Sequence, residues 1–501
     1  MQTHDPAKLI PNDFTPVPSL AWLDEIDVAF VDELGPGLDA VGVLVADSGA
    51  VSERLGLDRA ALERAGFAGK KSETLVVPQP AGPALVAVGT GPTSEVTTRS
   101  LRDIAAAFAR ATARFARIGL DVSGIDATTP DAAVQAVIEG LLLARYRYRA
   151  LRAEYTEPVP ARVEIAATGS DGEGLREGAA RAAATVRAAA VARDLANTPP
   201  GHLTAQNLGE VAVDLGAAYG FDVELFDRDD LIALGCGGVL GVNAGSAEEP
   251  RMIRLGYHGG ADRKLALVGK GIMYDSGGIS LKPSDPMHLL MKMDMGGAAA
   301  ILGAFTALRA LGVTADVSAW LMCTDNMPSG SAYKLGDVLT ARGGKTVEVK
   351  NTDAEGRLAM MDGLVLATEW EPDAIVDIAT LTGAALMALG PVTAALFAND
   401  QELADRVRAS SDSTAEQLWQ LPLERAYRKQ LDSDVADISN LGGPYAGATT
   451  AALFLDEFVG GTPWAHIDIA GTMQSATDDS WRSSGATGYG ARLLADLAQE
   501  F

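Results

Sequence analysis

The sequence is poor in cysteine and histidine, the residues that hold most structural and catalytic zinc ions. Among 501 residues there are two cysteines, Cys236 and Cys323, and five histidines. Neither a CxxC nor an HExxH motif occurs, which excludes a cysteine-rich zinc module, a disulfide framework and a histidine-based zinc protease site. We expect both thiols to be reduced and buried. His466, within the apolar run WAHIDIAG, is expected to be a hydrogen-bonded core residue.

Positive charge and long apolar runs are also scarce. Lys and Arg number 41 against 66 Asp and Glu, so the net charge is −25. Binding to nucleic acid or anionic membranes needs clustered Lys and Arg, so this balance disfavours both kinds of partner. No apolar run approaches the ~20 residues of a membrane helix, and the first residues lack a signal-peptide pattern. We therefore predict a cytoplasmic protein.

The length and the order of the apolar runs predict an α/β protein of two domains. Each domain should hold a mixed or mostly parallel sheet flanked by helices, because strand-like and helical patterns alternate. We predict domains at residues 1–172 and 199–501, joined by a long Ala- and Arg-rich helix over 173–198. In the first domain, strands are expected at 39–46, 73–79, 84–91 and 162–169, and helices at 97–119 and 131–151.

The second domain carries nearly continuous apolar strands, as expected when both faces of a sheet are covered. They are predicted at 264–271, 315–323, 373–381 and 464–471, with a helix at 296–312. Ligands of open α/β sheets bind beyond the carboxyl ends of the strands. We therefore searched the segments that follow these runs for charged side chains.

Charged residues in glycine-rich or apolar surroundings follow the strands. They are Lys270 and Asp275 in GKGIMYDSGG, Lys282 in SLKPS, Asp294 in MKMDMGGAA, and Asp353, Glu355 and Arg357 in NTDAEGRL. The octapeptide also fits a helix start, with Thr352 as N-cap and Glu355 completing a capping box.

These charges allow three interpretations: ordinary surface residues, a buried ion-pair network, or a metal site. Surface charge is the commonest, but it does not explain the apolar surroundings. A purely structural buried network is disfavoured because desolvation offsets the attraction. Four carboxylates could instead bridge two divalent ions ~3.5–4 Å apart, as in two-metal hydrolases.

Seven motifs in order resemble the leucyl aminopeptidase (cytosol aminopeptidase) family. They are VGKGIMYDSGGISLKPS, KMDMGGAAA, NMPSGSAYKLGDVL, NTDAEGRL, DIATLTGA, SDVADISNLGG and TPWAHIDIAGT, and they span roughly residues 190–495. The octapeptide is highly specific for this family. The N-terminal third resembles the family only in layout, as an α/β domain followed by a long helix.

The resemblance implies two divalent metal ions per chain, Mn²⁺ or Zn²⁺, at the carboxyl ends of the C-terminal strands. One ion would take Lys270, Asp275, Asp294 and Glu355, and the other would take Asp275, Asp353 and Glu355. An amine ligates only when neutral, and free lysine has a pKa of ~10.4. The metal would therefore have to displace a proton from this lysine.

The resemblance assigns catalysis to Lys282 and Arg357. Lys282 would stabilise the oxyanion that forms when the scissile carbonyl is attacked. Arg357 would hold a bicarbonate ion as general base, because the planar guanidinium matches a planar anion. The reaction would be hydrolysis of the first peptide bond of peptides with a free N-terminus, and Asp294 would contact the α-amine.

The resemblance also implies a pocket for the first side chain, which prefers leucine and similar apolar residues. Its members would be Met291, Thr380, Leu381, Gly383, Ala470 and Met473. The methionines would make an adaptable apolar surface, although both also fit an ordinary core. The segment between Lys282 and Asp294 is one residue longer than the usual family spacing, which bears on the rim near Met291.

The resemblance further implies a homohexamer. Two other functions remain open at this point. One is a DNA-binding or regulatory protein on the same scaffold, which the net charge of −25 disfavours. The other is an inactive homologue, which the complete ligand set disfavours.

Overall fold

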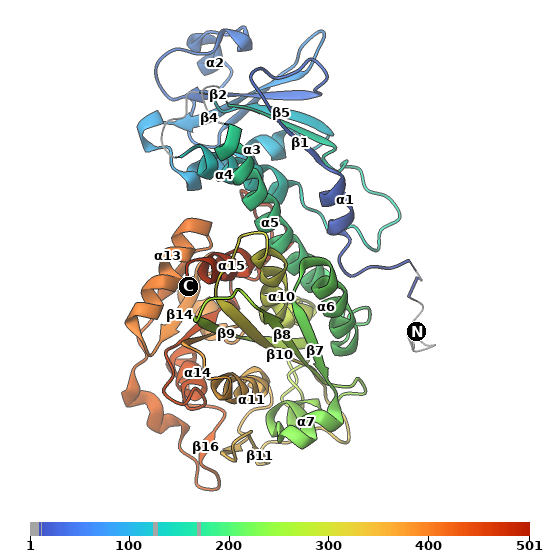
Figure 1. The fold of residues 1–501 in the computed structure, drawn as a ribbon, viewed down its shortest axis with the longest axis vertical. Helices are drawn as coiled ribbons and strands as arrows, with labels where there is room; N and C mark the ends of the chain where they lie inside the picture. The colour runs from blue at the N-terminus through green and yellow to red at the C-terminus, as the bar shows by residue number, and fades with distance from the viewer. Residues whose placement is uncertain (1–9, 12, 124–128, 168–171) are drawn as a thin grey trace. The chain divides into compact units, whose positions relative to one another are not determined.

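The computed structural model describes residues 10–11, 13–123, 129–167 and 172–501. The chain forms two compact units. The smaller unit comprises residues 18–190 and 475–484, and the larger unit comprises 1–17, 191–474 and 485–501. Each holds its own sheet with flanking helices, which confirms the predicted α/β fold of two domains (Figure 1). Among the described helices, none is long and apolar enough to span a bilayer.

The smaller unit is built on a six-stranded sheet. Its order is β1 (Asp27–Val31), β6 (Arg162–Ala166), β5 (Arg117–Asp121), β2 (Ala40–Ala46), β4 (Ala84–Gly91) and β3 (Thr74–Val77). All neighbours are parallel except β3 and β4. The four strands predicted here are present. The last of them ends at Ala166, and residues 168–169 lie outside the described part.

The helix predicted over 97–119 is wrong at its C-terminal end. Helix α3 spans Thr98–Ala111, and Arg117–Asp121 forms β5. This strand pairs on both sides, with β2 and with β6. Sheet pairing therefore overrides the helical pattern of Ala and Arg. Helix α4 (Pro130–Arg145) also ends before the predicted residue 151, and Arg145 donates hydrogen bonds to the Ala113 and Phe115 carbonyls.

The predicted long helix is α5, which spans Gly172–Asn197. The division between the two units falls within it, after Ala190, rather than at its ends. Its role as a connector and the domain limits given above stay predictions. Residues 475–484 join the smaller unit although they lie far along the chain, which no sequence pattern indicated.

The larger unit is built on an eight-stranded sheet. Its order is β15 (Leu418–Gln420), β14 (Ala394–Ala398), β17 (Trp464–Asp468), β13 (Ala374–Ala379), β9 (Lys264–Asp275), β10 (Asp316–Asn326), β8 (Arg251–Tyr257) and β7 (Asp222–Phe226). The four central strands, β17, β13, β9 and β10, are parallel and nearly continuously buried. These are the four strands that the sequence predicted for this domain.

Helices cover both faces of this sheet (Figure 1). One face carries α6 (Ala205–Tyr219), α10 (Gly296–Leu308) and α15 (Ala491–Gln499); the other carries α8 (Gly237–Asn243), α11 (Glu355–Glu369) and α14 (Gly447–Asp456). Helix α10 starts very close to the sheet, since a Cβ on Gly297 would lie 2.1 Å from the Ile378 carbonyl oxygen. Only glycine allows this approach, which brings the residues before α10 to the ends of β9 and β13.

Candidate functional site

One cavity of about 260 Å³ lies at the carboxyl ends of the central strands of the larger unit. Of the thirteen predicted site residues, all in the described part of the chain, twelve line it. They are Lys270, Asp275, Lys282, Met291, Asp294, Asp353, Glu355, Thr380, Leu381, Gly383, Ala470 and Met473. Arg357 is the exception. Segments far apart in the sequence therefore converge as the motifs predicted.

The deeper part of the cavity is centred on Lys270, which is 2% exposed. Its Nζ lies 2.8 Å from an oxygen of Asp294, 2.8 Å from Oε1 of Glu355 and 2.8 Å from the Thr380 carbonyl oxygen. Lys270 lies within β9, which continues to Asp275, four residues past the strand end at Gly271 predicted from the sequence. A Cβ on Gly356 would lie 2.5 Å from Cε of Lys270, so this glycine makes room for the lysine stem.

The outer part of the cavity is centred on Lys282. Its Nζ lies 2.7 Å from Oδ2 of Asp275 and 2.6 Å from Oδ1 of Asp353. Asp275 is the last residue of β9 and is buried, whereas the Asp353 side chain is 34% exposed. Lys282 thus pairs with two predicted metal ligands at the part of the cavity lining that is more exposed than Lys270.

The capping box predicted in NTDAEGRL is wrong. Helix α11 starts at Glu355, its N-cap is Ala354, and no side chain caps it. The Thr352 hydroxyl instead donates to the Gly277 carbonyl at 2.7 Å and accepts from the Ser280 N–H. Thr352 therefore joins the octapeptide to the loop after β9, and so brings Asp353 close to Asp275.

The cluster has more negative than positive charge, with four carboxylates against two lysines. Burial, together with Glu355, raises the pKa of Asp275 to about 6. Burial likewise raises the pKa of Asp294 to about 8. Burial disfavours the charge of Lys270, yet Asp294 and Glu355 raise its pKa above the usual lysine range. The cluster thus favours the uptake of positive charge.

The donor set fits divalent metal ions. Ligand oxygens of Asp275, Asp353 and Glu355 lie within 4.8 Å of one another. Oε2 of Glu355 is buried and has no hydrogen-bond partner among the described residues. Oxygen-rich ligand sets suit Mn²⁺, and carboxylates also bind Zn²⁺. A cation would neutralise the excess charge, and the two lysines now take part of that role.

Arg357 lies in the first turn of α11 and is 6% exposed. Its Nη1 donates to the Asn440 carbonyl at 2.9 Å, and its Nε is buried without a partner among the described residues. Burial lowers its pKa to about 10, while Glu355 and Asp468 oppose this shift. The guanidinium therefore has hydrogen-bonding capacity to spare, although it lies behind the residues that line the cavity.

The other end of the cavity is mainly apolar. Besides the predicted pocket residues, its lining includes Met287, Leu290 and Leu386. Met291 lines it in spite of the longer loop before Asp294. Met473 is 1% exposed and packs against Gly296, where a Cβ would lie 2.7 Å from its Sδ. The cavity thus combines a carboxylate end with a pocket for an uncharged side chain.

The structure adds polar residues that the sequence did not single out. The Asn326 amide donates to Oδ1 of Asp275 at 2.8 Å and to the Thr352 carbonyl at 2.9 Å. Tyr333 donates to the same carbonyl at 2.8 Å. Asn440 donates to the Asn351 carbonyl at 2.7 Å. All three residues lie inside quoted motifs, Asn326 and Tyr333 in NMPSGSAYKLGDVL and Asn440 in SDVADISNLGG, so a sequence signal for them existed.

His466 is buried in β17, and its Nδ1 lies 2.5 Å from Oδ1 of Asp377. Asp377 also accepts a hydrogen bond from the Trp464 indole at 2.6 Å. This agrees with the core histidine expected from the sequence. Both cysteines are free and buried, and burial raises the pKa of Cys236 to about 12.

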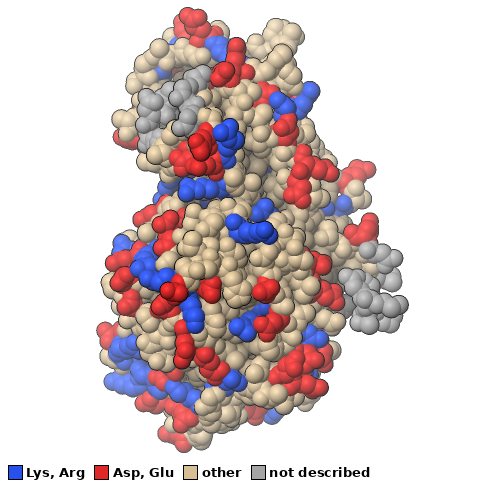
Figure 2. All heavy atoms as spheres, viewed as in Figure 1, with Lys and Arg blue, Asp and Glu red and all other residues tan. Residues whose placement is uncertain are grey.

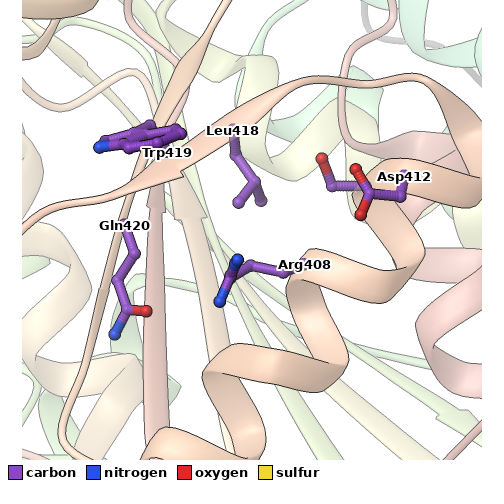
Figure 3. Close-up of a pocket in the computed structure, with 6 residues that line it drawn as sticks. Arg408, Asp412, Leu418, Trp419 and Gln420 are labelled. Carbon is purple, nitrogen blue, oxygen red and sulfur yellow. The ribbon is translucent and has the colours of Figure 1, made fainter.

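A second hollow, of about 340 Å³, lies at the edge strand β15 of the same sheet. Trp419, Gln420 and Leu418 project from the strand, and Arg408 extends toward them from α13 (Gln401–Thr414), as Figure 3 shows. Asp412 is the only carboxylate among its lining residues. It therefore lacks the carboxylate cluster of the main cavity.

Comparison with protein families agrees with this geometry. Residues 190–495 match the catalytic domain of the cytosol aminopeptidase family, and residues 42–154 match its N-terminal domain. The chain belongs to the cytosol aminopeptidase family. This confirms the resemblance seen in the motifs and extends it to the N-terminal third. Family membership makes the chain a metal-dependent aminopeptidase, a hydrolase of peptides.

Individual relatives cover nearly the whole chain. A probable cytosol aminopeptidase of Syntrophotalea carbinolica is 40% identical, over 96% of this chain and 95% of its own. A probable cytosol aminopeptidase of Chlorobaculum tepidum is 43% identical, over 82% of this chain and 85% of its own length. A solved structure, the bottromycin maturation enzyme BotP in complex with Mn, has a TM-score of 0.84 at 37% identity and covers 93% of this chain and 99% of its own. The Mn in that neighbour agrees with the divalent-metal site that the carboxylate cluster of this chain indicates.

Proposed function

We propose that the protein is a two-metal aminopeptidase that removes leucine and similar apolar residues from the N-terminus of peptides. One observation carries this proposal: twelve predicted residues line one cavity that has a carboxylate cluster at one end and an apolar pocket at the other. A peptide end offers both groups that such a cavity suits, a free amine and an adjoining side chain.

The carboxylate end would hold the metal ions and the substrate amine. Lys270, Asp275, Asp294, Asp353 and Glu355 are the proposed ligands of two divalent ions, Mn²⁺ or Zn²⁺. When bound, these ions would polarise the scissile carbonyl and lower the pKa of a water molecule. Asp294 lies beside the wall residue Thr380, so it is placed to contact the amine of a peptide whose side chain enters the pocket.

Lys282 and Arg357 are the proposed catalytic residues. In hydrolysis, water adds to the carbonyl carbon, the C–N bond breaks, and one water proton ends on the leaving nitrogen. Lys282 reaches the mouth of the carboxylate cluster, where its charge would stabilise the developing oxyanion. Arg357 would hold bicarbonate as general base through its guanidinium, whose Nε has no partner among the described residues.

Peptides, rather than nucleic acid, are the proposed partners. The net charge is −25, and Lys and Arg are interspersed with Asp and Glu on the face seen in Figure 2. Such a surface lacks the concentrated positive charge that phosphate contacts need. We propose a homohexamer from the family resemblance alone, and a cytoplasmic location from the sequence. Sedimentation that finds a stable, fully active monomer would contradict the hexamer.

The experiment that tests the proposed function combines kinetics with metal analysis. The protein is stripped by a chelator, dialysed, and refilled with Mn²⁺, Zn²⁺, Mg²⁺ or Co²⁺. Hydrolysis is then measured on a panel of amino-acid p-nitroanilides. We expect no activity without metal, two ions per chain when active, and the highest kcat/KM for leucine. Full activity with one ion, or without metal, would refute the two-metal proposal.

A further inference from the structure

Asp468, at the carboxyl end of β17, is a buried carboxylate that accepts four hydrogen bonds from two loops. It is 1% exposed. Its Oδ1 accepts from the N–H groups of Leu381 at 3.2 Å, Thr382 at 3.3 Å and Ala470 at 3.2 Å. Its Oδ2 accepts from the Thr382 hydroxyl at 2.6 Å. Asp468 itself does not line the cavity.

The two loops line the apolar pocket side by side, because they follow neighbouring strands of the sheet. Residues 380–383, after β13, form one part of the wall, and Ala470 and Met473, after β17, form the part beside it. Each wall has a separate outer anchor. The Thr380 hydroxyl donates to Oδ1 of Asp294 at 2.8 Å, and Met473 packs on Gly296. Asp468 contacts both walls, so it links them to each other.

The direct partners of the Asp468 carboxylate are groups of these two loops. No salt bridge to it is found among the described residues, and its charge acts on the Arg357 guanidinium only at longer range, where it opposes the lowering of the pKa of Arg357. Hydrogen bonds to a charged acceptor are roughly twice as strong as those between neutral groups. A carboxylate at this position thus holds three backbone N–H groups more firmly than a neutral side chain would.

We propose that Asp468 is a positioning residue that fixes the two wall loops relative to each other, and thereby the shape of the side-chain pocket and the preference for the first residue of the peptide. This inference rests on the proposed aminopeptidase function. Discrimination between apolar side chains depends on close contact with both walls, and a difference of one methylene is worth ~10–200-fold in such a pocket. If the two wall loops move apart, a leucine side chain loses contact with one of them. An alanine side chain is too short to make much contact with either loop, so its binding changes little.

The chain offers a matched control in Asp362, on α11. It is also fully buried and also accepts three backbone N–H bonds, from Gly238 at 2.9 Å, Val239 at 3.0 Å and Arg342 at 2.9 Å. It does not line the cavity. Asp468→Asn and Asp362→Asn are therefore the same substitution at buried aspartates that each accept three backbone N–H bonds, but only the first change affects the pocket walls.

The test measures kcat/KM for leucine and alanine p-nitroanilides, metal content and Tm in wild type and both variants. Asp468→Asn should retain both metal ions and lower kcat/KM by ~10-fold for leucine but less than ~3-fold for alanine. Asp468→Ala, where it folds, should reduce the preference further. Asp362→Asn should lower Tm and leave the leucine-to-alanine ratio as in wild type.

The outcomes separate this inference from the proposed function. An unchanged leucine-to-alanine ratio in Asp468→Asn, in a wild type that is active, would overturn the inference alone. An equal fall for both substrates with loss of metal would also overturn it, because Asp468 would then support the metal site. A metal-loaded wild type without aminopeptidase activity would refute the proposed function itself.

Discussion

The two ends of the cavity are held together by different forces. At the carboxylate end, side chains contact one another through charge, as Lys270 does with Asp294 and Glu355 at 2.8 Å. At the apolar end, the walls are held from behind by hydrogen bonds from backbone N–H groups to Asp468 and by packing of Met473 on Gly296. Few side chains of the pocket wall depend on one another directly.

This difference indicates where substitutions should have the largest effect. A buried charge that loses its partner is costly, because the partner stays desolvated without compensation. A change at the carboxylate end should therefore propagate to the remaining charges and to the metal ions. A change at the apolar end should alter which side chain is preferred and leave the chemistry intact.

The largest effect is expected for Glu355→Ala. Glu355 contacts Lys270, has an Oε2 without a hydrogen-bond partner in the described part of the chain, and is the proposed ligand shared by both ions. The variant should lose both ions and nearly all activity, whereas Asp353→Ala should weaken mainly one site. Metal content per chain after dialysis, together with kcat, measures this. Two tightly bound ions in an active Glu355→Ala protein would mean that the carboxylate end does not act as one unit.

Lys282→Ala should have the next largest effect. The lysine is not a proposed metal ligand, so the ions should remain while kcat falls by ~10²–10³-fold, as for loss of one oxyanion donor. Lys334→Ala is the control, because Lys334 is 67% exposed and pairs with Asp337 away from the cavity. Its kcat should equal that of wild type. Wild-type kcat in the Lys282 variant would remove this residue from the mechanism.

The sequence predicted the carboxylate end well, for a physical reason. Charged residues at the ends of buried parallel strands lie at the carboxyl edge of the sheet. Asp275, the last residue of β9, lies there as expected, whereas Asp353 reaches the cavity through the hydrogen bonds of Thr352 to the loop after β9. Strand positions in the larger unit were predicted from their continuous apolar runs, as β13 illustrates with every residue buried.

Other features could not be read from local pattern. The strand β5 looked helical, because its place in the sheet depends on partners distant in sequence. The capping box failed because Thr352 bonds to the loop after β9 instead of its own helix. Asp468 lies in the quoted motif TPWAHIDIAGT, but its role could not be predicted from the sequence, since three of its four partners are backbone N–H groups that any residue would supply.

Asn326→Leu should have a smaller effect, on metal affinity. Its amide orients Asp275 and the segment before Asp353. Loss of such an outer partner typically costs 10–100-fold in metal affinity, so ~10–100-fold weaker binding is expected in a metal titration. Asn243→Leu is the control, because Asn243 is equally buried and its amide donates to Glu248 and Thr324. Equal metal affinity in the Asn326→Leu and Asn243→Leu variants would show that Asn326 does not orient the metal ligands.

The smallest effect at this end is expected for Arg357, the predicted residue that does not line the cavity. Arg357→Ala should retain both metal ions, and water or buffer can partly replace a general base. The fall in kcat should therefore stay within the ~10²-fold lower range of general-base effects. Added bicarbonate should stimulate wild type at low carbonate and barely affect the variant. Arg357→Lys should not restore wild-type behaviour, because a point charge lacks the planar fork. The measurements are steady-state kinetics with and without bicarbonate, together with metal content. A wild-type kcat and an undiminished bicarbonate response in Arg357→Ala would contradict a catalytic role for Arg357.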